Sequence, residues 1–161
     1  MDSQAALTAA RLTSIPLAFI AAGYGIMASH NVLPRLSQEK PQVSTPLFAH
    51  VFRAGGKFIV PTGLLSTAAS AYLAYVLPEE RQLWSTAALF TLGTLPWTRL
   101  VMFSGILRLI AISESEKEAH KCEGSGEHVY LMKRWMFQNY IRASMFGVAG
   151  FFGLWAVLGQ K

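Results

Sequence analysis

Residues 134–142, RWMFQNYIR, open an apolar run that continues as ASMFGVAGFFGLWAVLG to residue 159. An α-helix needs about 20 apolar residues to cross the roughly 30 Å of hydrocarbon in a bilayer, and this run is long enough. Three earlier runs have the same character, so we expect four spans, near residues 5–29, 58–77, 83–103 and 135–158. The pattern predicts an all-α membrane protein in which residues 1–161 form one bundle of four transmembrane helices.

The composition also indicates a membrane protein. Hydrophobic residues make up 52% of the chain and charged residues only 14%, and the mean hydropathy is +0.34, which is too apolar for an ordinary soluble domain. The first run is longer than a signal-peptide core and carries Arg11 inside it, so we interpret it as a helix. A single cysteine, Cys122, excludes an internal disulfide framework, and we expect it to be a plain loop thiol.

The net charge of +5 does not indicate nucleic-acid binding, because the basic residues form no run with interleaved aromatic side chains. A four-span topology explains the excess instead. With both termini on one side, the other side holds nine lysines and arginines: Arg35, Lys40, Arg53, Lys57, Arg108, Lys117, Lys121, Lys133 and Arg134. The positive-inside rule therefore predicts cytosolic long loops and termini in the lumen or at the exterior.

The connections between the spans differ in length and chemistry. Residues 30–57 contain Pro34, Pro41 and Pro46, which argue against a long helix, so we predict a loop that ends in a lead-in helix. Residues 76–84, VLPEERQLW, form a short turn that makes an antiparallel hairpin of the second and third spans. Residues 112–130 are strongly charged, and we predict a surface excursion with a helical extension of the third span and with solvated histidines.

Besides Arg11 near the start of the first span, Arg99 and Arg142 fall within the expected spans, whereas no Asp or Glu does. An arginine stays charged and is costly in hydrocarbon, so it faces the bundle interior, pairs with another group or snorkels to the interface. For Arg142 we expect internal placement. For Arg99, which follows Pro96 and Trp97, snorkelling and internal placement both stay open.

One face of the fourth span carries a group of residues whose chemistry fits a binding site. At 100° per residue, the side chains of Trp135, Asn139, Arg142 and Phe146 fall within about 40° of one line. We predict that Asn139 and Arg142 line a cavity and that a ligand supplies the missing anion. Thr98 of the third span could reach the same cavity, although a threonine in a helix most often bonds to its own backbone.

His50 and Lys57 are the other polar candidates, because they share one face of a helix that begins before the second span. The remaining histidines are scattered, and no His/Asp/Glu pair has metal-ligand spacing within a span, so we expect no metal, and no haem or flavin site is indicated.

The length, the four-span plan and three motifs resemble small membrane proteins of the DUF1772 type, which include the fungal anthrone oxygenases. The motifs are GGKFIVP at residues 55–61, LPWTRLVM at residues 95–102 and RWMFQNYIR at residues 134–142. The resemblance covers nearly the whole chain, but its specific part is the W, N and R pattern on Trp135, Asn139 and Arg142. The chain departs from many relatives in MFSGILRL, where Ser104 and Gly105 stand in place of an Asn-containing turn.

The resemblance implies a cofactor-independent monooxygenase that converts an anthrone-type aromatic polyketide to an anthraquinone with molecular oxygen. By this resemblance, Arg142 and Asn139 would bind the enolate oxygen and Trp135 would stack on the flat rings. The other substrate-binding residues would be Thr98, Arg99 and Phe146. His50 would be the first candidate for the base, because imidazole exchanges protons near neutral pH. Lys57 would be the second, once desolvation leaves its amine neutral.

Two other classes of function stay open on the sequence. One is a glutathione-using membrane transferase of the MAPEG type, although the spans lack acidic residues that would hold the glutathione amine. The other is a non-enzymatic membrane helper protein. The expected partners are the substrate, oxygen and the lipid bilayer, with a homo-oligomer left open. The resemblance implies an endomembrane such as the endoplasmic reticulum.

Overall fold

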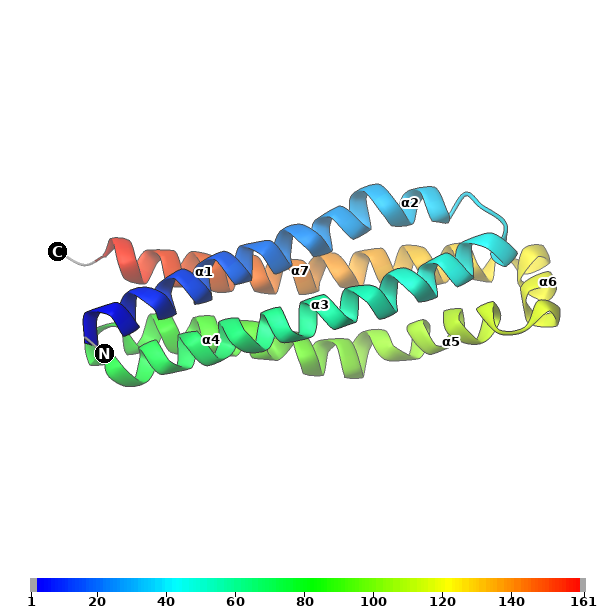
Figure 1. Cartoon of the computed structure of the whole chain (residues 1–161). Coiled ribbons are helices and arrows are strands. Elements are labelled where there is room, and N and C mark those ends of the chain that lie inside the picture. The colour runs from blue at the N-terminus through cyan, green and yellow to red at the C-terminus, as the bar shows by residue number, and fades with distance from the viewer. Residues whose placement is uncertain (1–2, 160–161) are drawn as a thin grey trace.

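The computed structural model describes residues 3–159 and shows a bundle of long antiparallel helical segments (Figure 1). The first segment runs through α1 (Ser3–Met27), the π-helical turn η1 (Ala28–Val32) and the short α2 (Leu33–Leu36). The second segment is α3 (Pro41–Val76), and the third runs through η2 (Pro78–Glu80), α4 (Arg81–Trp97), the π-helical turn η3 (Thr98–Met102) and α5 (Phe103–Ser113). The short α6 (Glu116–Ser125) then leads into the fourth segment, α7 (Glu127–Leu158).

Four segments of the described chain are long and apolar enough to cross a membrane. They are Gln4–Leu36, Pro41–Val76, Pro78–Ser113 and Glu127–Leu158, which confirms the predicted bundle of four spanning helices. The start of α1 and the end of α7 lie at the same end of the bundle, opposite α6 (Figure 1). A segment of 36 residues is roughly 54 Å long, so the bundle extends well beyond a hydrocarbon layer of about 30 Å.

The predicted loop between the first two spans is wrong for most of its length. Only residues 37–40 lie outside helices there, and α3 begins directly at Pro41. A proline is well suited to the first position of a helix because its missing N–H would have no partner in that turn. α3 continues through Gly55 and Gly56, and a close neighbour on α1 explains the first of these glycines. A Cβ atom on Gly55 would lie 3.0 Å from Oη of Tyr24.

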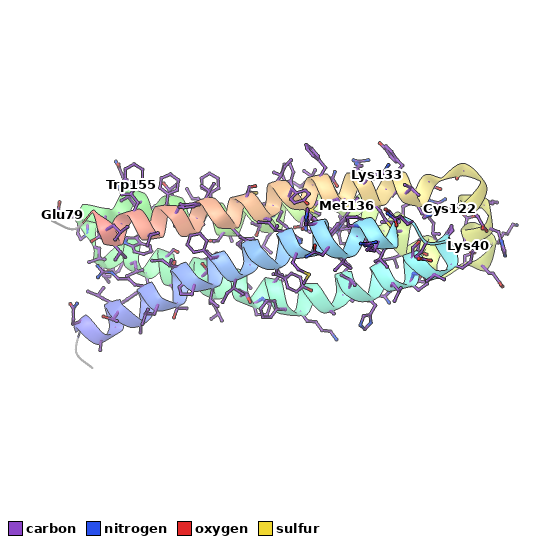
Figure 2. The ribbon with its side chains drawn as sticks, turned by 90° about the horizontal axis from the view of Figure 1, so that it is seen from above. Lys40, Glu79, Cys122, Lys133, Met136 and Trp155 are labelled. Atoms are coloured by element: carbon purple, nitrogen blue, oxygen red, sulfur yellow. The ribbon has the colours of Figure 1, made fainter. Side chains whose placement is uncertain are left out.

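The bundle has a core of large side chains at the end that carries α6. Leu33, Phe48, Ile106 and Met132 are buried there together with Cys122. The prediction of a plain loop thiol is therefore wrong, because Cys122 lies in α6 and burial raises the pKa of its thiol. Figure 2 shows Cys122 and Lys40 at this end of the bundle, with Glu79 and Trp155 at the opposite end.

The charged connection also folds more tightly than the sequence predicts. His128, expected in solvent, is buried, and its backbone N–H donates to Sγ of Cys122 at 3.1 Å. The expected helical extension of the third span is confirmed by α5, which continues to Ser113. This end of the bundle is a packed cap around the long helices.

At the end that carries the start of α1, small residues let the helices approach closely. A Cβ atom on Gly150 would lie 2.8 Å from the ring of Phe19, so α1 and α7 could not keep this spacing with a larger residue. The hydroxyls of Ser14 and Ser70 lie 2.6 Å apart and join α1 to α3. The middle of the bundle lies between this close packing and the core of large side chains, and a cavity is found there.

Candidate functional site

A cavity of about 200 Å³ lies in the middle of the bundle between α1, α3, α7 and the segment from α4 to α5. Most of its lining is apolar, from residues such as Phe52, Ile59 and Leu95. A cavity bounded mostly by apolar side chains suits a small organic molecule whose surface is largely apolar. The charged and polar groups at its wall therefore determine what chemistry it favours.

Arg142 of α7 lies at this wall and is half-buried. Its Nη2 donates to Oδ1 of Asn139, and its Nη1 makes a long hydrogen bond of 3.4 Å to Oγ1 of Thr98. Among the described residues, no carboxylate forms an ion pair with Arg142. A buried cation with only neutral partners attracts an anion, and the internal placement expected for Arg142 is confirmed.

Asn139 holds Arg142 in place and does not line the cavity, contrary to our prediction. Its side chain is fully buried, and Nδ2 donates to the carbonyl oxygen of Gly25 at 2.9 Å and to Oγ of Ser29 at 2.7 Å. The two donors are used by α1 and η1, so Oδ1 is turned toward the guanidinium. Asn139 is therefore a positioning residue that ties the arginine to the first helical segment.

Trp135 lies one turn before Asn139 on α7 and is only 5% exposed. It lines the cavity, and its ring meets the ring of Phe48 edge to face at a centroid distance of 5.6 Å. Its indole N–H is buried and has no hydrogen-bond partner among the residues that the structure describes. Buried donors in folded proteins are nearly always paired, so this one points to an acceptor that a ligand would bring.

Thr98 and Arg99 lie in the π-helical turn η3, and both line the cavity. Oγ1 of Thr98 donates to the carbonyl oxygen of Thr94 at 2.7 Å, which is the expected bond to its own helix, and still accepts from Arg142. Arg99 is exposed, and its guanidinium carbon lies 4.1 Å from the centre of the Phe103 ring. Arg99 therefore lies at the mouth of the cavity. It is exposed, as snorkelling requires, and it also lines the cavity, as internal placement requires.

The structure does not bring His50 and Lys57 to the cavity. Both are exposed and neither belongs to the lining, because they lie on the outer face of α3. The inner face of the same helix carries Phe48, Gly55 and Ile59, which are buried. The prediction that either basic group removes a proton from a ligand inside the cavity has no support from this geometry.

Phe146 is buried, but it packs behind the cavity wall instead of forming it. A Cβ atom on Gly63 would lie 3.3 Å from its ring, so the phenylalanine fills the space left by that glycine. Phe146 therefore supports α3 at the level of the site and does not contact the open space.

Two groups of lining residues were missed by the sequence reasoning. Tyr24 of α1 lines the cavity, although it looks like an ordinary membrane-interface tyrosine in sequence. Gly55, Gly56 and Gly63 of α3 also line it and leave room where larger residues would fill it. The GGK motif contained this signal, because two consecutive glycines in a spanning helix indicate close approach or open space.

The titratable side chains at the cavity wall, among the residues that the structure describes, are those of Tyr24, Arg99 and Arg142. In the same part of the chain, no group of three or more His, Cys, Asp or Glu residues is arranged to hold a metal ion. The wall thus offers cations, hydroxyls and an unpaired indole N–H. These groups favour an aromatic molecule that carries negative charge on oxygen.

A comparison with known families agrees with this chemistry. The family model described as Anthrone oxygenase matches residues 48–152, which is more than half of the chain and includes the residues of α3, α4, η3 and α7 at the site. No curated protein and no solved structure matches the chain. On this family match, the chain belongs to the anthrone oxygenase family.

Proposed function

We propose that this protein is a membrane oxygenase that converts an anthrone-type aromatic polyketide to an anthraquinone with molecular oxygen, without a metal or organic cofactor. The observation that carries the proposal is Arg142, a half-buried cation without a carboxylate partner among the described residues, at the wall of an apolar cavity. The family match supports an oxygenase role, and the chemistry of the cavity wall supports the enolate mechanism.

The substrate itself supplies the electrons for this reaction. An anthrone has a methylene group between two aryl rings, and loss of one proton from it gives a delocalised enolate. The enolate gives electrons to oxygen and forms a carbon–oxygen bond, which yields a hydroperoxide once it is protonated. Loss of the second methylene proton with cleavage of the O–O bond then gives the quinone carbonyl and releases water.

Arg142 stabilises the negative charge that develops on the substrate oxygen. A guanidinium fixed in an apolar site lowers the free energy of a nearby anion much more than the same group does in water. Asn139 keeps the guanidinium aimed at the cavity, so little reorganisation is needed when the charge forms. The indole N–H of Trp135 supplies a donor for a second oxygen of the substrate.

The methylene proton of the substrate must leave by a different route from the one predicted from the sequence, in which His50 or Lys57 removes it. Because His50 and Lys57 lie on the outer face of α3, we infer that the cation makes the bound substrate acidic enough to lose its proton to a solvent-borne base. We place this proton transfer at the mouth of the cavity, next to Arg99. His50 and Lys57 can then act only on a proton that has already left the cavity.

The two alternative functions have less support from the geometry. A glutathione-using transferase needs a carboxylate to hold the peptide amine, and none lines the cavity in the described chain. A non-enzymatic helper protein needs no unpaired cation or indole N–H at a cavity. We therefore retain the oxygenase, in an endomembrane with cytosolic long loops, as the proposal.

The direct test is oxygen uptake by membranes that contain the protein, with a polyhydroxylated anthrone as substrate. Membranes are treated with a chelator and dialysed, and quinone formation is followed together with oxygen consumption. We expect one quinone for each oxygen molecule consumed, at a rate well above that of membranes from cells without the protein. Equal rates in both membranes across several anthrones would overturn the proposal, and a rate that returns only on adding metal would overturn its cofactor independence.

A further inference from the structure

Among the described residues, the exposed part of the cavity lining lies on one side of the bundle. Val60 and Leu64 of α3 are 42% and 47% exposed, and Leu92 of α4 is 45% exposed, although all three line the cavity. The described lining residues of α1 and α7 are buried or half-buried. The opening therefore lies between α3 and the segment that begins with α4.

This opening faces the hydrocarbon of the membrane over most of its length. The turn between α3 and α4 carries Glu79, Glu80 and Arg81, which cannot lie in hydrocarbon, so one surface of the bilayer is at this turn. At 1.5 Å per residue, Leu64 and Leu92 both lie about 17–18 Å from the turn, close to the middle of a layer about 30 Å thick. Arg99 lies about 27 Å from the turn, near the opposite boundary of that layer.

A glycine of α3 leaves further open space beside the opening. Gly56 lines the cavity and is half-buried, and a Cβ atom placed on it would meet no heavy atom within 4 Å. The lips of the opening at Leu64 and Leu92 are thus apolar, and the open space continues past Gly56, about two turns further along α3 near the level of Arg99. A flat hydrocarbon ring system could pass there without removing water from any polar group.

We propose that this opening is a lateral portal through which a lipid-dissolved, flat aromatic ketone enters the cavity directly from the bilayer. The identity of the ligand rests on the proposed function, whereas the position of the portal rests on the exposure of Val60, Leu64 and Leu92. A tricyclic ketone partitions into hydrocarbon, and so does oxygen, which brings both reactants to the same entrance. Arg99 at the boundary and Arg142 inside then attract the polar oxygen of the ketone.

The test uses 1-aminoanthracene, a fluorescent tricyclic probe that does not undergo the proposed reaction, with the purified protein in phospholipid vesicles. Leu64→Trp/Leu92→Trp places two bulky rings on the lips of the portal. Its matched control is Leu65→Trp/Leu89→Trp, on the same helices, where both leucines are exposed but do not line the cavity. Gly56→Phe is a second blocking variant, with Gly147→Phe as its control, because a Cβ atom on Gly147 also meets open space away from the cavity.

We expect the association rate of the probe to fall at least tenfold in both blocking variants and to change less than twofold in both controls. The difference between wild-type and Gly56→Phe vesicles early after mixing gives the signal of the bound probe. That signal should be quenched by phospholipids with a nitroxide in the middle of the acyl chain and not by aqueous iodide.

Equal association rates in blocking and control variants would overturn the portal, and so would quenching by iodide without quenching by the nitroxide lipids. Because no anthrone is oxidised in this assay, the outcome is independent of the proposed reaction. Probe binding through the portal without oxidation of anthrones would overturn the proposed function alone. Oxidation of anthrones at full rate in both blocking variants would overturn the portal alone.

Discussion

Two arginines of this protein have opposite surroundings, although both lie on long helical segments that the sequence predicts as spans or their extensions. Arg108 of α5 is held by Glu127 through two hydrogen bonds of 2.8 Å and by Glu118 at 2.9 Å, so its charge joins α5, α6 and α7. Within residues 3–159, Arg142 of α7 has only the neutral oxygens of Asn139 and Thr98 as hydrogen-bond partners. The difference separates a cation that holds the fold together from one that is left for a ligand.

Removing the charge of Arg142 should have the largest effect on activity. In Arg142→Gln we expect the rate of anthrone oxidation to fall about 10²–10³-fold, which is the loss typical of removing one donor to a developing oxyanion. Quinone formation in vesicles at saturating oxygen measures it. Arg108→Gln is the matched control, because it removes an equal charge away from the cavity, and equal rate losses in the two variants would contradict the distinction between the arginines.

Giving Arg142 a carboxylate partner should make it resemble Arg108. Asn139→Asp adds an anion next to the guanidinium, and Asn139→Ala removes the same hydrogen bonds to Gly25 and Ser29 without adding charge. We expect the rate with Asn139→Asp to be about tenfold below that with Asn139→Ala, because the new carboxylate competes with the enolate for the cation. A higher rate with Asn139→Asp than with Asn139→Ala would show that Arg142 does not act through its charge.

Arg108→Gln should lower stability and leave catalysis almost unchanged. Its side chain is 38% exposed, so water screens its ion pairs with Glu118 and Glu127. We expect the free energy of unfolding in detergent to fall by about 1–2 kcal/mol. The oxidation rate of the folded fraction should stay within about twofold of wild type, and a loss of activity without a loss of stability would contradict a structural role.

The loss of stability in acid also tests the structural role of the Arg108 ion pairs, with a smaller expected effect. Hydrogen bonds from Arg108 and then Lys121 hold the pKa of Glu118 below its usual value of 4.5. This carboxylate therefore stabilises the fold above its unfolded pKa, and that contribution is lost as the pH falls below about 4.5 through the lowered folded value. Unfolding curves between pH 6 and about pH 3 should show a steeper loss for wild type than for Arg108→Gln. Parallel curves would mean that the ion pairs do not contribute to stability.

Most of the fold follows from the sequence because apolar run length is a direct consequence of bilayer thickness. The four spans and the inward face of Trp135, Asn139, Arg142 and Phe146 are both confirmed. The start of α3 at Pro41 could not be predicted from the prolines alone, because a proline breaks a helix interior but suits the first position of a helix. Burial of Cys122 and His128 was missed because the packing around α6 comes from distant segments.

The site residues were only partly predictable from the sequence, because the sequence does not show which face of α3 turns toward the inside of the bundle. His50 and Lys57 are seven residues apart and do share a face, but spacing alone does not say whether that face meets the bundle or the lipid. Asn139 was predicted at the cavity and instead reaches back to Gly25 and Ser29. Those partners lie more than 100 residues away in the chain, so helical periodicity could not identify them.

The most direct test of the central claim is an anaerobic titration of the bound substrate. An anthrone is held under argon in vesicles with the protein, and the enolate absorbance is followed against pH, so that ionisation is seen without oxidation. The account predicts that the pKa of the bound anthrone lies about one to three units below its value in protein-free vesicles. It also predicts that Arg142→Gln removes the shift and that Arg108→Gln keeps it. An unshifted pKa in the wild-type protein, or an equal shift in Arg142→Gln, would contradict the claim that this arginine stabilises the enolate.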